Sequence, residues 1–234
     1  MVEVVFEGPA KNALGSELMR EALGRVQAAE GAPLLIRGAG DSFSAGLNLK
    51  EILALDRDGM RGFLDLLGGL LDALWRYPGP TVAAVNGHAI AGGCLVALVC
   101  DHRVGTTEPT ARIGLNEVAL GLRFPPFVLR MIQARIGDLH LPEVVLGAGL
   151  HDPENALRLG FLDEITPDPV AVARERVALL GSYSAEVYAA TKASLRPAIT
   201  PTEAEQAAFA AEVVPLWASD ALKERIRAVL NRKR

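Results

Sequence analysis

The sequence of 234 residues lacks long apolar runs, an excess of basic residues and closely spaced cysteines. No run reaches the roughly 18 apolar residues of a membrane-spanning helix, so we expect no membrane partner. The formal net charge is −4, whereas nucleic-acid-binding proteins normally carry a basic face, so we expect no nucleic-acid partner. The first residues show no signal-peptide or transit-peptide pattern, which predicts a cytoplasmic protein.

Cysteine and histidine do not form a metal-binding pattern. Cys94 and Cys100 lie six residues apart in one apolar stretch, which fits neither a metal clip nor a redox CxxC motif. We expect both to be buried small apolar side chains. The four histidines, at positions 88, 102, 140 and 151, show no ligand spacing. The sequence therefore predicts no metal site.

Three common functional motifs are also missing. Gly38 and Gly40 follow a predicted strand, as in a dinucleotide-binding turn, but Phe43 takes the place of the third glycine. The segment 40–44 ends in serine, where a nucleophile elbow needs glycine, and no P-loop is present. We therefore expect no nucleotide cofactor.

Short apolar strands alternate with helical patterns in the first half of the chain. Strands are predicted in residues 2–8, 32–38, 80–87 and 102–106. Helices are predicted in residues 16–31, in 49–75 with breaks near Gly59 and at Gly68-Gly69, and in 94–101, which is apolar on every side. This alternation is typical of an α/β fold with a largely parallel sheet covered by helices.

From about Leu120 the pattern becomes mainly helical. Asp152-Pro153 is a typical helix start, and Thr202 with Glu205 forms a capping-box pattern for a helix reaching about Trp217. We predict one α/β core in residues 1–183 and a helical C-terminal region in residues 184–234.

Two glycine-containing turns can each present a backbone N–H group to a ligand. The first is "SFSAGLNL" (42–49), and the second is "AIAGGCLVAL" (89–98), where Gly92-Gly93 opens a buried helix. Glycine permits close approach to the backbone, and a helix N-terminus adds unpaired N–H groups. Two such turns facing each other would form an oxyanion hole, although each turn alone fits a purely structural role.

Glu117 is the only carboxylate in the mostly apolar segment "ARIGLNEVALGLRFPPFV" (111–128). Apolar surroundings disfavour the charged form of a carboxyl group, so we expect the pKa of Glu117 to be raised. A raised pKa suits a group that takes a proton and later returns it.

The segments "FSAGLNL", "NGHAIAGGCLVALVCD" and "IGLNEVALG", in this order, resemble the enoyl-CoA hydratase/isomerase (crotonase) superfamily. Within it, the chain most resembles the Δ3,Δ2-enoyl-CoA isomerases, from "KNAL" (11–14) to about Val187. The resemblance implies a (ββα)-repeat spiral core with a helical C-terminal extension. It also implies an acyl-CoA thioester substrate, no separate cofactor, and a homotrimer or a dimer of trimers. The family usually begins with two strands, of which this chain shows only the second.

The resemblance also implies roles for particular residues. The catalytic residues would be Glu117 and the peptide N–H donors Leu47 and Gly92. Substrate- or CoA-binding residues would be Ser44, Ala45, Gly46, Leu47, Asn48, Leu49, Gly92 and Asn116. Hydratases carry a second glutamate three residues after the Gly92 position, and here that position is Leu95.

A single carboxylate favours moving a double bond over adding water. We therefore predict conversion of 3-enoyl-CoA to trans-2-enoyl-CoA in fatty-acid β-oxidation. Alternatives are a hydratase or thioester hydrolase that uses Glu117 alone, and a catalytically silent paralogue with a binding role. Candidates for the acyl pocket are Phe63, Leu64, Leu67, Phe124 and Phe127, and candidate cations for the CoA phosphates are Arg37, Lys50 and Lys192. Taken singly, we expect most of the apolar candidates to be core residues and each of the cations to be a solvated surface residue.

Overall fold

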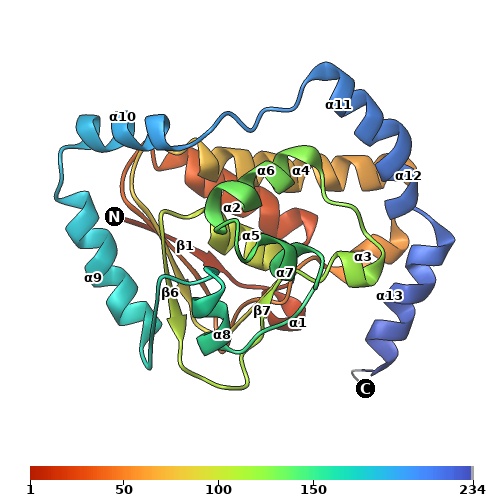
Figure 1. Cartoon of the computed structure of the whole chain (residues 1–234), viewed down its shortest axis with the longest axis horizontal. Coiled ribbons are helices and arrows are strands. Elements are labelled where there is room, and N and C mark those ends of the chain that lie inside the picture. Colours follow the sequence, from red (N-terminus) through yellow and green to blue (C-terminus); the bar gives the residue numbers. More distant parts are fainter. Residues whose placement is uncertain (233–234) are drawn as a thin grey trace.

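Five parallel strands form the larger of two sheets. In the computed structural model, which describes residues 1–232, their order is β1–β2–β4–β6–β8 (Figure 1). Their bounds are β1 Val2–Phe6, β2 Leu34–Gly38, β4 Thr81–Val85, β6 His102–Thr106 and β8 Glu164–Thr166. Every neighbouring pair is parallel, as the alternation of strands and helices predicted. Four of the five strands lie where the sequence placed them.

A second sheet contains three short parallel strands in the order β3–β5–β7. Their bounds are β3 Ser42–Ser44, β5 His88–Ile90 and β7 Ile113–Gly114. Each of them follows a strand of the larger sheet. In the pairs β2–β3, β4–β5 and β6–β7, the first strand therefore belongs to the larger sheet and the second to the smaller one. Helices follow these pairs, which is the predicted (ββα)-repeat arrangement. Strands of two or three residues are too short to show a period in the sequence, and none of them was predicted.

The helices cover both sheets and continue to the C-terminal end of the described chain. Their bounds are α1 Pro9–Asn12, α2 Ser16–Ala28, α3 Leu49–Ala54, α4 Arg57–Trp75, α5 Gly92–Val99, η1 Val118–Leu120, α6 Pro126–Arg135, α7 Leu141–Val145, α8 Pro153–Arg158, α9 Pro169–Gly181, α10 Ala185–Leu195, α11 Glu203–Ala208, η2 Phe209–Val213, α12 Val214–Trp217 and α13 Asp220–Arg232. Within residues 1–232 no helix is both long and apolar enough to cross a membrane.

The predicted breaks in the helical segment 49–75 were wrong in position. The segment divides at Leu55 and Asp56, and α4 then continues without a break through Gly59 and Gly68-Gly69. Asp56 starts α4 because its side chain accepts a hydrogen bond of 2.8 Å from the Gly59 N–H. A polar N-cap thus sets the start of α4, whereas glycine inside a helix only lowers the stability of the helix.

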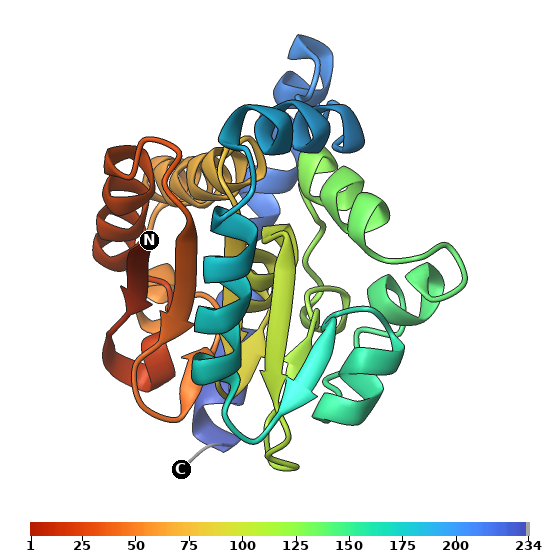
Figure 2. The same ribbon diagram turned by 90° about the vertical axis from the view of Figure 1, so that its left-hand side faces the viewer.

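Helix α5 is buried along its whole length, as its apolar sequence predicted. Cys94 lies within α5 and Cys100 directly follows it, and both are free and buried. The opposite face of the larger sheet is covered by α9, whose Ala173 and Val177 pack on Leu35 and neighbouring strand residues (Figure 2). The sheet is therefore enclosed on both faces, which is usual for parallel strands.

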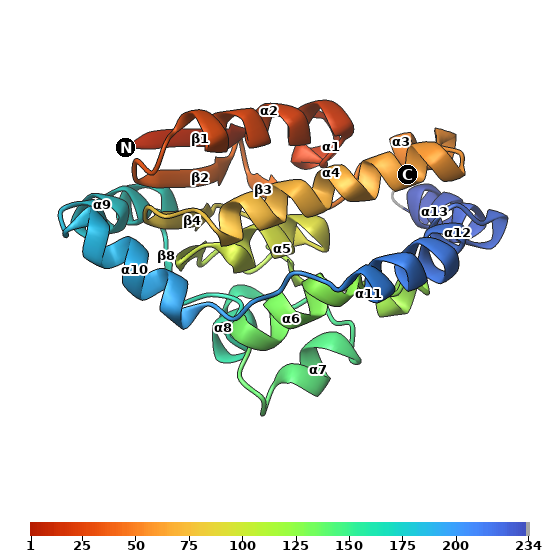
Figure 3. The same ribbon diagram turned by 90° about the horizontal axis from the view of Figure 1, so that it is seen from above.

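Helix α12 packs on α4, and α13 packs on α3 (Figure 3). The capping box of Thr202 and Glu205 is present, and α11, η2 and α12 follow one another to Trp217 as predicted. Helix α10 is anchored to the core by Asp101, whose carboxylate accepts hydrogen bonds from Tyr188 at 3.0 Å and Lys192 at 2.7 Å, and also pairs with Arg196. Burial lowers the pKa of Lys192 to about 8.

We expect Asp101→Ala to lower the free energy of unfolding by about 3–5 kcal/mol, because it leaves the buried charges of Lys192 and Arg196 without their partner. Urea denaturation measures the change. The matched control is Glu21→Ala, which breaks the exposed pair with Arg25 and should cost at most about 0.5 kcal/mol. Equal values for the two variants would contradict this account of the anchor.

Candidate active site

The three predicted catalytic residues follow the three strands of the smaller sheet. Leu47 lies in the turn after β3, Gly92 comes directly after β5 and Ala91, and Glu117 comes three residues after β7. Because these strands are adjacent and parallel, their carboxyl ends meet at one edge of the sheet. The sheet therefore brings together three segments that are far apart in the sequence.

Glycine allows the first two turns to touch. Gly46 has a φ of +91°, which favours glycine, and a Cβ atom there would lie only 2.7 Å from the Ile90 carbonyl oxygen. A Cβ atom at Gly93 would lie 2.6 Å from the Ser44 carbonyl oxygen. Any larger residue at either position would push the turns apart. The glycines thus have a structural role that the predicted oxyanion hole requires.

The backbone N–H of Leu47 is oriented by a short parallel bridge to Leu14. The Leu14 N–H donates to the Gly46 carbonyl at 2.7 Å, and the Asn48 N–H donates to the Leu14 carbonyl at 2.9 Å. In this pattern the N–H of Leu47 itself points away from Leu14. Gly92 is the first residue of α5, and the first N–H groups of a helix have no hydrogen-bond partner within the helix. Within residues 1–232 neither N–H donates a hydrogen bond to another backbone group.

Glu117 lies at the start of η1 and is only 5% exposed. Burial raises the pKa of its carboxyl group from the usual 4.5 to about 7, and a hydrogen bond from its own backbone N–H offsets only part of this effect. The predicted rise in pKa is confirmed. The Oε2 atom is buried and has no hydrogen-bond partner among the described residues. The carboxyl group is therefore surrounded mainly by apolar atoms and is half ionised near neutral pH.

Glu117, Leu47 and Gly92 line one small cavity of about 20 Å³, which we name the inner cavity. Its volume corresponds to about one water molecule. The side chain of Leu95 also lines it, so hydrocarbon occupies the position of a second carboxylate.

Four of the five candidates for the acyl pocket line the inner cavity as well: Leu64, Leu67, Phe124 and Phe127. Phe63 does not line it and is part of the hydrophobic core.

The remaining predicted binding residues do not line the inner cavity, and two of them stabilise the first turn. The Ser44 hydroxyl donates to the Asn12 carbonyl at 2.8 Å, and the Asn48 side chain caps α3. Ala45 and Leu49 are half-buried in the same segment. The Oδ1 atom of Asn116 is buried without a hydrogen-bond partner in the described chain. CoA binding by Ser44, Ala45, Gly46, Asn48, Leu49 and Asn116 stays a prediction.

Two of the three candidate cations for the CoA phosphates are engaged elsewhere. Lys192 is buried and bonded to Asp101 and to the Gly79 carbonyl, so this candidate was wrong. Arg37 pairs with Glu3 at 2.9 Å, and the same Glu3 pairs with an arginine of α9, which covers the face of the sheet opposite α5. Lys50 is exposed and lies two residues from the Asn48 cap, so it remains the candidate nearest the predicted CoA end.

Sequence reasoning missed Trp217, which lines the inner cavity from the end of α12. Its side chain is 4% exposed, and its indole Nε1 has no hydrogen-bond partner in the described chain. Nothing near Trp217 in the sequence indicates this position, because the packing of α12 on α4 brings it there. The C-terminal region therefore completes a cavity formed by the core.

The model of the enoyl-CoA hydratase/isomerase family matches residues 1–230, so the chain belongs to this family, as its motifs predicted. The crystal structure of human mitochondrial delta3-delta2-enoyl-CoA isomerase has a TM-score of 0.87 at 25% identity, covering 100% of this chain and 97% of that one. The predicted α/β crotonase-like fold is thereby confirmed. Members of the family act on enoyl-CoA thioesters.

Curated relatives include both isomerases and hydratases. Human mitochondrial enoyl-CoA delta isomerase 1 is 30% identical over 168 residues, which cover 70% of this chain and 56% of the relative. A probable enoyl-CoA hydratase of Mycobacterium tuberculosis is 31% identical over 196 residues, covering 82% and 75%. The chain spans about half the length of the mammalian isomerases that it matches. These isomerases are named mitochondrial, and the cytoplasmic location of this chain stays a prediction.

The raised pKa of Glu117 predicts a pH-dependent stability. The folded state holds the proton of the Glu117 carboxyl group more tightly than the unfolded state. The resulting contribution to the free energy of unfolding is complete below about pH 4.5 and is lost as the pH rises through about 7. Glu117→Gln cannot ionise. Its free energy of unfolding relative to the wild type should therefore increase by about 3 kcal/mol over this pH range and then stay level.

Urea denaturation of both proteins at several pH values between 4.5 and 8 measures this difference. A difference that does not change with pH would show that Glu117 titrates normally in the folded protein.

Proposed function

We propose that the protein isomerises 3-enoyl-CoA to trans-2-enoyl-CoA in fatty-acid β-oxidation, with Glu117 as the single acid–base residue. The observation that carries this proposal is the shared lining of the inner cavity, where Glu117, Leu47 and Gly92 meet. A carboxyl group and two backbone donors are the groups that proton abstraction next to a thioester carbonyl requires.

In the first step, Glu117 takes a proton from C2 of the substrate. The C2–H electrons move toward the thioester, and its oxygen gains negative charge as a dienolate forms. The N–H groups of Leu47 and Gly92 donate hydrogen bonds to this oxygen, each worth roughly 3 kcal/mol of barrier lowering. In the second step, Glu117 returns the proton to C4, and the double bond lies between C2 and C3.

The environment of Glu117 supports both steps. Its pKa of about 7 makes it a stronger base than an exposed glutamate, and the protonated form is then a competent acid at the same pH. Leu95 offers no second carboxylate to orient a water molecule for addition to the double bond. These features favour isomerisation over hydration.

Hydration of 2-enoyl-CoA is the second candidate function. The probable hydratase among the relatives favours it, and so does an inner cavity that has room for one water and is lined by both Glu117 and Trp217. A thioester hydrolase that uses Glu117 alone, or a catalytically silent binding protein, would show neither isomerisation nor hydration.

We also propose that residues 184–234 serve as a lid and as an assembly region. Trp217 in the lining of the inner cavity supports the first role. Exposed apolar side chains at Tyr183, Val187 and Leu195, around α10, support assembly into a homotrimer or a dimer of trimers.

We expect Glu117→Gln to lower kcat for 3-hexenoyl-CoA by about 10²- to 10⁴-fold, because the amide cannot accept the C2 proton. The rate of formation of the 2-enoyl thioester measures the change. In the wild type, kcat/KM should rise with pH and level off above an apparent pKa near 7, since only ionised Glu117 acts as the base. The matched control, Glu154→Gln at an exposed position of α8, should keep full activity.

Two results would contradict the proposal. One is a Glu117→Gln variant that retains the wild-type rate. The other is a wild-type protein that hydrates 2-hexenoyl-CoA faster than it isomerises 3-hexenoyl-CoA.

A further inference from the structure

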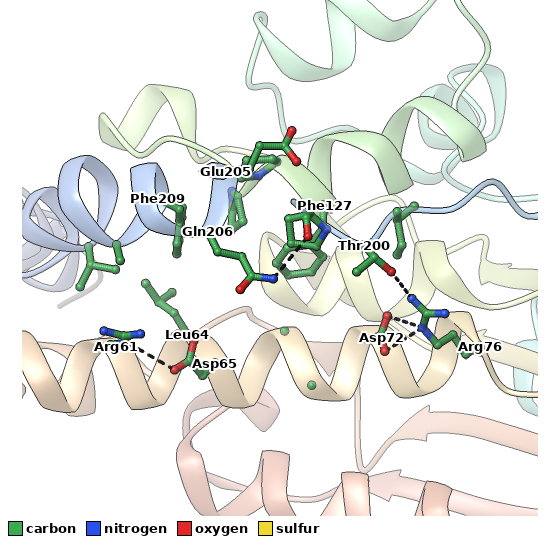
Figure 4. Close-up of a pocket in the computed structure, with 18 residues that line it drawn as sticks. Arg61, Leu64, Asp65, Asp72, Arg76, Phe127, Thr200, Glu205, Gln206 and Phe209 are labelled. Carbon is green, nitrogen blue, oxygen red and sulfur yellow. Dashed lines mark hydrogen bonds and ion pairs between the residues drawn. The ribbon is translucent and has the colours of Figure 1, made fainter. Parts of the chain in front are cut away.

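A second and larger cavity, of about 360 Å³, lies between α4 and the segment that carries α11 and η2 (Figure 4). We name it the outer chamber. Its lining includes Gly68 and Gly69 of α4, Phe127 at the start of α6, and Ile199 and Phe209 of the C-terminal region. Figure 4 shows Phe127 above α4, between this helix and the segments that carry Gln206 and Thr200.

The outer chamber and the inner cavity share a wall. Leu64, Pro125 and Phe127 line both of them. Leu64 is buried and Phe127 is only half-buried, so the phenyl ring is the shared side chain with more freedom to move. Rotation of this ring is therefore a way to join the two spaces.

The inner cavity alone is too small for an acyl chain. Its 20 Å³ corresponds to about one water, whereas a chain of six carbons has several times the volume of a water molecule. The part of the chain beyond the reacting carbons must leave the inner cavity. The outer chamber lies directly across the shared wall.

The lining of the outer chamber suits hydrocarbon better than a charged ligand. Leu64, Phe127, Ile199 and Phe209 supply apolar surface. The charged residues of the lining are already paired, Arg76 with Asp72 at 2.8 Å and Arg61 with Asp65 at 3.9 Å. Both arginines of this lining thus have an acidic partner.

Gly68 and Gly69 place two residues of α4 without side chains in the lining of the outer chamber. Glycine inside a helix costs about 1 kcal/mol relative to alanine, so two together in mid-helix weaken α4. A Cβ atom at Gly68 would lie 3.2 Å from Cζ of Phe127, closer than is usual, whereas Gly62 of the same helix has no atom within 4 Å of that position. The ring of Phe127 therefore lies against bare backbone at Gly68.

We propose that the outer chamber receives the distal part of the acyl chain, with Phe127 as its movable wall and Gly68 as the residue that sets the accepted chain length. This inference rests on the proposed function for the identity of the ligand, an acyl-CoA thioester. It assigns a specificity-determining role to a glycine that the chemistry does not use.

The test is the binding of hexanoyl-CoA and dodecanoyl-CoA, measured by calorimetry on the full chain. These saturated thioesters do not react, so binding is read separately from turnover. We expect Gly68→Leu to weaken dodecanoyl-CoA binding at least tenfold and hexanoyl-CoA binding less than twofold. Phe127→Ala should strengthen dodecanoyl-CoA binding relative to hexanoyl-CoA binding. Gly62→Leu, the matched control, should leave both affinities unchanged.

Gly68→Ala guards against misfolding, because alanine favours the helix, and it should shift the preference toward the short chain in the same direction. An unchanged ratio of the two affinities in Gly68→Leu, Gly68→Ala and Phe127→Ala would overturn the inference, even if 3-hexenoyl-CoA is isomerised. Normal chain-length shifts without any isomerisation would instead support the chamber and refute the proposed reaction.

Discussion

The site depends on the parallel alignment of three very short strands. Because β3, β5 and β7 are neighbours in one sheet, the segments that follow them end at the same edge. This places a backbone donor from Leu47, another from Gly92 and the carboxyl group of Glu117 around one cavity. The larger sheet and its helices provide the buried frame that keeps the short strands in register.

At this edge of the smaller sheet, the burial of Glu117 lowers the stability of the fold but favours the proposed acid–base chemistry. A carboxylate without a hydrogen-bond partner is costly inside a protein, and Glu117 has such an oxygen. The same burial raises its pKa to about 7, which permits it to act as base and then as acid. The glycines of the two turns and of α4 likewise weaken local structure, while they allow close contact at the site. The proposed chemistry therefore depends on positions that lower the stability of the fold.

The sequence contained enough information for the core of the site but not for its outer parts. The resemblance to a known family assigned roles to Glu117, Leu47 and Gly92. The residues themselves predicted only a raised pKa for Glu117 in its apolar segment, and turns able to present backbone N–H groups. The strands β3, β5 and β7 were too short to show a period. Trp217 and the ion pairs of Lys192 depend on how the C-terminal helices pack, which no local pattern records. The predicted breaks in the helical segment 49–75 were misplaced, because the side chain of Asp56, and not a glycine, sets the start of α4.

The most direct test of a single proton-carrying residue follows deuterium placed at C2 of 3-hexenoyl-CoA. If Glu117 takes the proton and returns it within an enclosed cavity, a measurable fraction of the deuterium will appear at C4 of the product by NMR. Without such an enclosed cavity, the deuterium would exchange into solvent before it could be transferred to C4 of the same bound molecule. If the deuterium taken from C2 is lost entirely to water at full catalytic rate, the account is contradicted, because a second base or a solvent-exposed intermediate would then carry the proton.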